Sequence, residues 1–391
     1  MRGSTTAPDP AHEPVQRGPR SRAITVLLPV LGLIVVALCG LLLFGLATAK
    51  VGVLAVVIGV LAALVPVGFV VAAFLWVDRW EPEPARLLLL AFVWGAFIAT
   101  VTALLINSTA EAVGDMLLGS GNGNKISALV SAPLVEEAAK AAFVLIVFWR
   151  RSQEFDGVVD GIVYAGFSAA GFAFTENIYY FGRAFAEAGF GNGTSSGVLA
   201  AFVLRGVLSP FTHPLFAALT GIGIGFAAST ANRQLRWLAP LGGYMAAVCL
   251  HALWNGAAVL GGAKTFLNIY FLIMAPMFIG LVSLVVMQRR REQQIVAAAL
   301  PQMATARWIA PSEIGLLASL AGRREWRRRA RKQSGRRAAK AVGRYQASVT
   351  ELAFLLRGTV HTDDAKRRQA ELLTVLRNSR AEAVRLAEGA S

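Results

Sequence analysis

Cysteine and charge are both scarce in this sequence. Only two cysteines occur among 391 residues, Cys39 and Cys249, and both lie within apolar segments. The chain therefore offers neither a disulfide framework nor a CxxC metal knuckle. Charged residues make up 16% of the chain and hydrophobic residues 55%, and the mean hydropathy is +0.56. This composition is typical of a polytopic membrane protein and predicts an all-α bundle of transmembrane helices.

The few charges are strongly biased in sign. The formal net charge is +15, which would indicate nucleic acid as a partner in a soluble protein. Here most arginines and lysines lie outside the apolar runs, so their positions say more than their number. We expect no nucleic-acid partner.

The first 22 residues are polar and proline-rich. The apolar stretch that follows is longer than the apolar region of a signal peptide and has no clear cleavage site. We therefore expect a disordered tail over residues 1–22 and a retained first span.

About eight transmembrane helices follow from the rule that a bilayer core needs roughly 20 apolar residues per helix. Pro210 and Pro214 interrupt the sixth segment, which predicts a short or re-entrant piece over 197–208 followed by a full helix and offers a natural lateral gate. The transmembrane domain is thus expected over 23–288. The predicted spans are 23–48, 52–77, 86–107, 127–149, 158–181, 197–229, 237–261 and 266–288.

Basic residues concentrate in alternate loops. The positive-inside rule then places both termini in the cytoplasm of a cell-membrane protein. Tryptophans such as Trp80 are interpreted as interface-belt or packing residues. The loops on the basic side carry Arg17, Arg20, Arg22, Arg79, Arg86, Arg150, Arg151, Arg233, Arg236 and Arg289 to Arg291, against Lys50, Lys125, Arg183 and Lys264 opposite.

Residues 289–391 form a basic, partly helical tail. It contains a dense basic run over 323–344, and the spacing of Leu372 and Leu376 fits an amphipathic helix. A basic run this close to the last span most simply binds anionic lipid head groups.

Ionisable side chains recur inside the predicted spans, where each costs several kcal/mol unless it faces the bundle interior. The helical rise of 1.5 Å per residue places them all in the outer half of the membrane. Four separate segments therefore bring acids, imidazoles and amides to a similar depth. The set comprises Glu136, Glu137 and Lys140, then Glu176 and Asn177, then Arg205 and His213, and finally His251 and Asn255.

The spacing of these residues suggests chemistry but does not prove it. Lys140 can neutralise one of the two acids on its own helix, and His251 projects together with Asn255. Two imidazoles and a carboxylate would form a His2Glu site like that of zinc hydrolases, with a further glutamate to deprotonate water. No H-E-x-x-H motif is present, so the ligands would come from different helices. A structural ion pair and neutral core histidines are the alternatives for the separate residues.

The same motifs, in the same order, resemble the PrsW family of bacterial intramembrane proteases, which is distantly related to the CAAX prenyl endopeptidases. They are EEAAK at Glu136, FAFTEN ending at Asn177, THPLF at His213, HALWN at His251 and DRWEPEP at Asp78. The resemblance covers about residues 50–290.

The resemblance implies roles for single residues. Glu136 and Glu137 would be the catalytic acids, and Glu176, His213 and His251 the ligands of a divalent metal such as zinc. Asn255 would stabilise the oxyanion, with Lys140 and Asn177 in support.

The implied substrate is a single-pass membrane protein such as an anti-sigma factor, cut near the outer leaflet by glutamate-activated water. Two other hypotheses remain open: a proton-coupled transporter or channel using the Glu/His cluster as a relay, and a scaffold whose basic tail carries the function.

Overall fold

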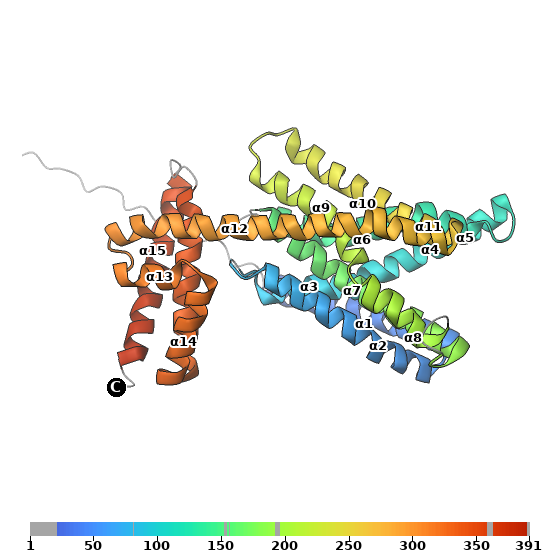
Figure 1. The fold of residues 1–391 in the computed structure, drawn as a ribbon, viewed down its shortest axis with the longest axis horizontal. Helices are drawn as coiled ribbons and strands as arrows, with labels where there is room; N and C mark the ends of the chain where they lie inside the picture. Colours follow the sequence, from blue (N-terminus) through green and yellow to red (C-terminus); the bar gives the residue numbers. More distant parts are fainter. Residues whose placement is uncertain are drawn as a thin grey trace, which may run out of the picture.

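The chain folds into a bundle of long helices with a smaller helical unit at one end (Figure 1). The computed structural model describes residues 22–80, 82–151, 155, 157–191, 196–357 and 363–388. Within these ranges the regular structure is helical, with no strand. The predicted all-α class is therefore confirmed. The tail predicted over 1–22 lies outside the described residues, apart from Arg22 at the start of the first helix.

Short breaks and π-helical turns divide the bundle into several elements. They are α1 (Arg22–Val51), α2 (Val53–Val77), α3 (Ala85–Val93), η1 (Trp94–Ala99), α4 (Thr100–Leu118), α5 (Gly123–Ile126), η2 (Ser127–Ser131), α6 (Ala132–Arg150), α7 (Val158–Ala188), α8 (Gly197–Phe202), η3 (Val203–Leu208), α9 (Thr212–Ser229), α10 (Leu235–Leu260), α11 (Gly262–Ile269), η4 (Tyr270–Met274) and α12 (Ala275–Thr305).

Seven helical stretches in the described part of the chain are long and apolar enough to cross a membrane. The segment that contains α6 is not one of them, because Glu136, Glu137 and Lys140 lower its apolar character. With α6 the bundle has the eight segments predicted. The third stretch is longer than predicted, since it runs without interruption from Ala85 to Leu118.

The sixth segment is broken, as its prolines predict. η3 ends at Leu208, and α9 begins at Thr212, so residues 209–211 form the break. Pro210 cannot donate a backbone hydrogen bond, which makes a continuous helix unfavourable here. The break places His213 in the first turn of α9.

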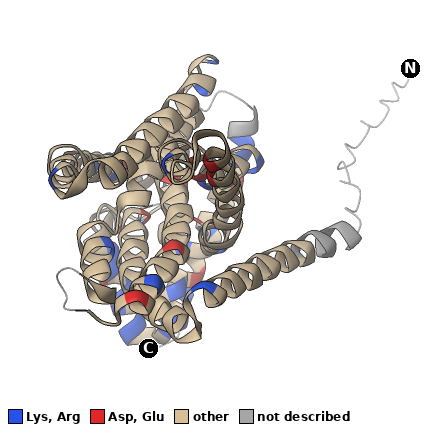
Figure 2. Ribbon diagram, turned by 90° about the vertical axis from the view of Figure 1, so that its right-hand side faces the viewer, with Lys and Arg blue, Asp and Glu red and all other residues tan. Residues whose placement is uncertain are grey.

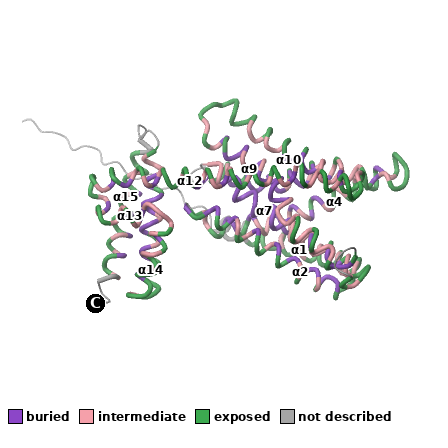
Figure 3. Tube along the Cα trace, in the orientation of Figure 1, coloured by how far each residue is buried: buried purple, intermediate pink, exposed green. Residues whose placement is uncertain are grey.

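Helix α7 forms the centre of the bundle and is largely buried (Figure 3). It packs against α2, α3, η1, α6 and α9. Glycines allow the backbones to meet: a Cβ atom on Gly171 would lie 2.0 Å from the carbonyl oxygen of Phe92, and one on Gly161 would lie 2.0 Å from that of Gly221. Such small-residue contacts are typical of helix packing in membranes.

The C-terminal residues form a second apolar core. The last turns of α12 pack there with η5 (Pro311–Glu313), α13 (Ile314–Leu317), α14 (Leu320–Arg357) and α15 (Asp363–Glu388). Leu372 and Leu376 lie in this core, on α15. The predicted boundary between residues 288 and 289 falls inside the uninterrupted helix α12; the predicted domain limits stay a prediction.

The turn between α2 and α3 connects the two units. Trp80, in this turn, is 3% exposed and belongs to the C-terminal core, and the Arg323 guanidinium lies 4.9 Å from the centre of its ring. On the other side, the hydroxyl of Tyr164 on α7 donates to Glu83 Oε2 at 2.6 Å. Residues of the transmembrane bundle and residues of the C-terminal unit thus both contact the α2–α3 turn.

Asp78 of this turn lines one pocket together with Gly157, Ser229 and Arg291, so the connections that carry most of the arginines meet here. We call this end of the molecule the basic end of the bundle.

Candidate active site

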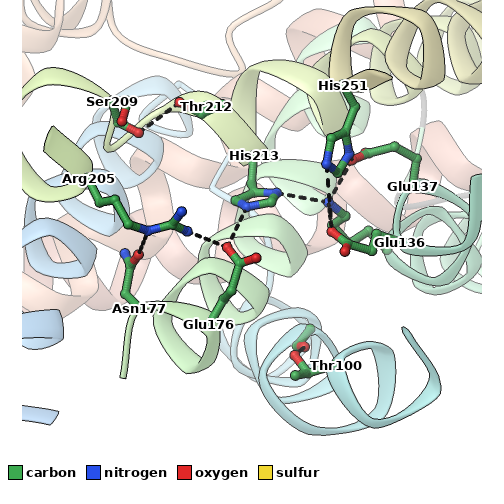
Figure 4. A network of polar contacts seen from close by, with 12 residues as sticks. Thr100, Glu136, Glu137, Glu176, Asn177, Arg205, Ser209, Thr212, His213 and His251 are labelled. Carbon is green, nitrogen blue, oxygen red and sulfur yellow. Dashed lines mark hydrogen bonds and ion pairs between the residues drawn. The ribbon is translucent and has the colours of Figure 1, made fainter. Parts of the chain in front are cut away.

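A buried polar network joins the acids of α6 to the histidines of α9 and α10 (Figure 4), and Lys140 contacts three members of it. Its ammonium donates to Glu137 Oε1 at 2.7 Å and contacts His213 Nδ1 at 3.2 Å. Glu136 Oε2 lies 3.9 Å from the same nitrogen. All three α6 side chains are buried, and the spacing of three and four residues places them on one face of the helix. The lysine therefore balances part of the negative charge of the two acids.

His251 reaches this network from α10. Its Nδ1 lies 2.8 Å from Glu137 Oε1, and because a carboxylate oxygen accepts, Nδ1 is the donor. Its other nitrogen, Nε2, lies 4.0 Å from Glu136 Oε2. The ring stacks on Phe216 of α9 with 4.8 Å between the ring centres. This arrangement leaves Nε2 free to act as a ligand.

His213 contacts the network from the opposite side. Its Nε2 lies 2.8 Å from Glu176 Oε2 on α7. Since an ammonium can only donate, Nδ1 of His213 accepts from Lys140 and Nε2 donates to Glu176. Arg205, on η3, donates to Glu176 as well, and its Nε donates to Asn177 Oδ1 at 2.8 Å. Two adjacent α7 residues thus fix the broken segment next to the site.

Glu136, His213 and His251 could together hold a metal ion. Each offers one ligand atom, and these atoms all lie within 4.8 Å of one another. Glu136 Oε2 and Glu137 Oε2 are buried and have no hydrogen-bond partner among the described residues, as expected for oxygens that bind an ion or a water. The residues present therefore fit a metal. Glu176, predicted as the third ligand, lies behind His213 instead; its assignment as a ligand stays a prediction.

Asn255 lies one helical turn beyond His251 and contacts a different element. Its Nδ2 donates to the carbonyl oxygen of Ala128, on η2, at 2.8 Å. The amide thus links α10 to the segment before α6. Its predicted role toward an oxyanion stays a prediction.

Asn107 is a polar neighbour of the site that the sequence analysis missed. Its Nδ2 donates to Glu136 Oε1 at 3.4 Å, and its Oδ1 accepts from Ser131 Oγ at 2.7 Å. The predicted third span ended at residue 107, which made this asparagine look like an end residue. The extension of α4 to Leu118 places it within the helix and beside the acids.

The chain is similar in sequence to one family of known proteins. Residues 83–281 match the family model described as "PrsW family intramembrane metalloprotease". Protease PrsW of Clostridioides difficile is 29% identical over 184 residues, 45% of this chain and 68% of that protein. Protease PrsW of Geobacillus kaustophilus is 29% identical over 161 residues, 41% of this chain and 63% of that protein. Protease PrsW of Oceanobacillus iheyensis is 25% identical over 240 residues, 61% of this chain and 99% of that protein.

No solved structure is significantly similar to the chain. The matched region begins at the α2–α3 turn and ends within α12, and it includes all the polar residues of the site. The chain therefore belongs to the PrsW family of intramembrane metalloproteases, and its activity is that of an intramembrane endopeptidase.

Proposed function

We propose that the protein cleaves single-pass membrane proteins near the outer leaflet, with zinc as its metal and Glu137 as the base that activates water. One observation carries the proposal: His213 and His251 each donate to a carboxylate, and their other ring nitrogens converge with Glu136. A histidine held by a carboxylate in this way is the usual arrangement at a metal site.

The proposed ligands are His213 Nδ1, His251 Nε2 and Glu136 Oε2. Binding of the metal at His213 Nδ1 would replace the hydrogen bond that Lys140 donates to this nitrogen, so the ammonium would move toward Glu137. Two imidazoles and one carboxylate form a typical catalytic zinc set, which leaves a further position for water. When bound, zinc would polarise the substrate carbonyl and lower the pKa of water. Glu176 would orient His213, and Glu137 would orient His251.

Glu137 is the acid best placed to take a proton. One of its oxygens is held by Lys140 and His251, whereas Oε2 has no hydrogen-bond partner in the part of the chain that the structure describes. Lys140 would keep this carboxylate ionised when substrate excludes water. Asn255 Nδ2 donates one of its two N–H groups to the Ala128 carbonyl, and the other would bind the oxyanion.

The basic end of the bundle would lie in the cytoplasm, which places both termini there by the positive-inside rule. The exposed arginines and lysines of α14 would bind anionic lipid head groups. An anti-sigma factor is one candidate substrate.

The test compares cells that express the wild-type chain, Glu137→Gln or the control Glu111→Gln, which changes an exposed glutamate on α4. Quantitative proteomics of the membrane fraction should find products that depend on Glu137 and are unchanged in the control. Purified protein should contain zinc, and a chelator should abolish cleavage until zinc is returned. Proton uptake into liposomes without any cleavage product would support the relay hypothesis and contradict the proposal.

A further inference from the structure

The proposed protease needs a route by which a substrate helix reaches its buried acids. The exposure of the acids gives the direction of that route. The side chain of Glu137 is 0% exposed, whereas that of Glu176 is 24% exposed. Glu176 and Arg205, whose side chain is 25% exposed, are therefore members of the network that are reached from outside the bundle.

Glu176 also lines an apolar groove of about 570 Å³. This volume is within the range of roughly 300–1,000 Å³ that ligand pockets span. We call it the α1 groove. Its walls come from five elements and include Phe44 and Ala47 of α1, Val56 of α2, Phe97 of η1, Leu104 of α4 and Ile178 of α7.

Helix α1 forms the outer wall of the groove and is only loosely attached. None of its residues from Val30 to Val51 is buried, although this stretch is the most apolar of the candidate spans. Figure 2 shows the helix standing away from the bundle, which it contacts with its C-terminal half. At Gly40, an added Cβ atom would lie 3.3 Å from Phe97 Cε1. A wall held by so few contacts can move at little cost.

The groove is not uniformly apolar. Thr175 and Glu176 line it on the α7 side, and Ser108 and Lys50 line it on the α4 and α1 sides. The hydrocarbon part of an acyl chain has no atoms that could form hydrogen bonds with these side chains. A peptide whose helix is unwound for cleavage exposes carbonyl and amide groups that must be paired inside a membrane.

We propose that the α1 groove is the docking site for the transmembrane segment of the substrate, with α1 as the movable wall that admits it. This inference rests on the proposed function. The apolar residues of the substrate would pack between Phe44 and Ile178, and its unwound part would pass Glu176 to reach Glu137. The route differs from the gate predicted at the broken sixth segment, since the two lie on different elements.

The first test uses photocrosslinking in cells. Phe44 is replaced by p-benzoylphenylalanine in the full-length Glu137→Gln variant, which retains uncut substrate. The matched control carries the same group at Leu41, which is 69% exposed on the same helix and does not line the groove. We expect Phe44, and not Leu41, to capture a protein whose cleavage product disappears in Glu137→Gln cells.

Crosslinks to phospholipid alone at Phe44, or equal capture of that protein from both positions, would overturn the inference while Glu137-dependent cleavage upheld the proposed function. If no product depends on Glu137, the proposed function and the inference fail together.

The second test fills the groove. Ala47→Trp should lower cleavage of the captured protein at least tenfold, while Leu41→Trp should leave it unchanged. The metal content of purified Ala47→Trp should equal that of the wild type, which shows that the site is intact. Cleavage by Ala47→Trp at the wild-type rate would overturn the inference. If Ala47→Trp contained less metal than the wild type, the crosslinking result at Phe44 and Leu41 would decide whether the inference holds.

Discussion

Glu176 accepts a hydrogen bond from His213 Nε2 at 2.8 Å, and this contact leaves Nδ1 of the histidine facing Glu136 and Lys140. If Glu176 only orients the ring, Glu176→Ala should weaken metal binding about 10- to 100-fold, while Glu136→Ala should leave no bound metal. Metal titration of the purified variants distinguishes the two roles. Complete loss in Glu176→Ala with metal retained in Glu136→Ala would instead make Glu176 the ligand that the sequence predicts.

Lys140 compensates buried negative charge, so its removal should be costly. Lys140→Met leaves the Glu137 carboxyl group buried without its lysine, and removing one partner of such a pair costs about 3–5 kcal/mol. We expect lower thermal stability in detergent for this variant. The double variant with Glu137→Gln should recover part of the loss, because less unbalanced charge remains buried. Equal stability of Lys140→Met and the wild type would contradict this account.

The contact between α7 and η1 depends on Gly171. A Cβ atom there would meet the Phe92 carbonyl oxygen, so Gly171→Ala should destabilise the bundle by about 1–3 kcal/mol. Gly68 on α2 has no atom within 4 Å of an added Cβ, and Gly68→Ala should be neutral or stabilise by up to about 1 kcal/mol. Thermal unfolding of the two variants checks whether the same chemical change has opposite effects.

Trp80 should anchor the C-terminal unit to the bundle. Trp80→Ala removes a buried indole from the C-terminal core, which typically costs about 3–5 kcal/mol. We expect limited proteolysis to cut α13 to α15 faster in this variant. Trp237→Ala, at an exposed position on α10, serves as the control and should leave the cleavage pattern unchanged.

Asp78 should make the stability of the α2–α3 turn depend on pH. Burial raises the pKa of this carboxyl to about 7, although the backbone amide of Glu83 that donates to it acts in the opposite direction. In the unfolded chain the pKa is about 3.9, so between about pH 4 and pH 7 the folded state holds a proton that the unfolded state releases. The free energy of unfolding should therefore fall as the pH rises through this range and level off above it.

The change Asp78→Asn keeps a hydrogen-bond acceptor and removes the titration. Thermal unfolding of this variant between pH 4.5 and 7.5 should lose much of the slope seen in the wild type. An identical slope in both proteins would show that other groups cause it.

Apolar length and proline positions were enough to predict the helical class and the break before His213, because both follow from local backbone chemistry. The helices that carry the polar set were also predictable, since charge inside an apolar run is visible in the sequence. The sequence did not allow us to predict which of the two adjacent acids on α6 would face the histidines. Glu136 and Glu137 differ by about 100° around α6, and the packing of α6 against α4, α7, α9 and α10 sets that rotation.

The surroundings of Trp80 show the same limit. A tryptophan beside a predicted span fits an interface belt, and the sequence allowed packing as the other interpretation. Its place in a core built from residues more than two hundred positions later depends on tertiary contacts that no local pattern contains. The helices of the C-terminal residues were predicted from spacing, but their association with the α2–α3 turn was not.

Helix α12 continues from the membrane bundle into the C-terminal core without a break, and this continuity fixes the rotational phase of one unit relative to the other. A single residue inserted near Arg290 would turn the C-terminal unit by about 100° around the helix axis and carry Arg323 away from Trp80. Insertion of a whole turn would restore the angle but lengthen the spacer by about 5.4 Å. The relative orientation of the two units therefore depends on the number of residues in α12 as well as on the contacts between the units.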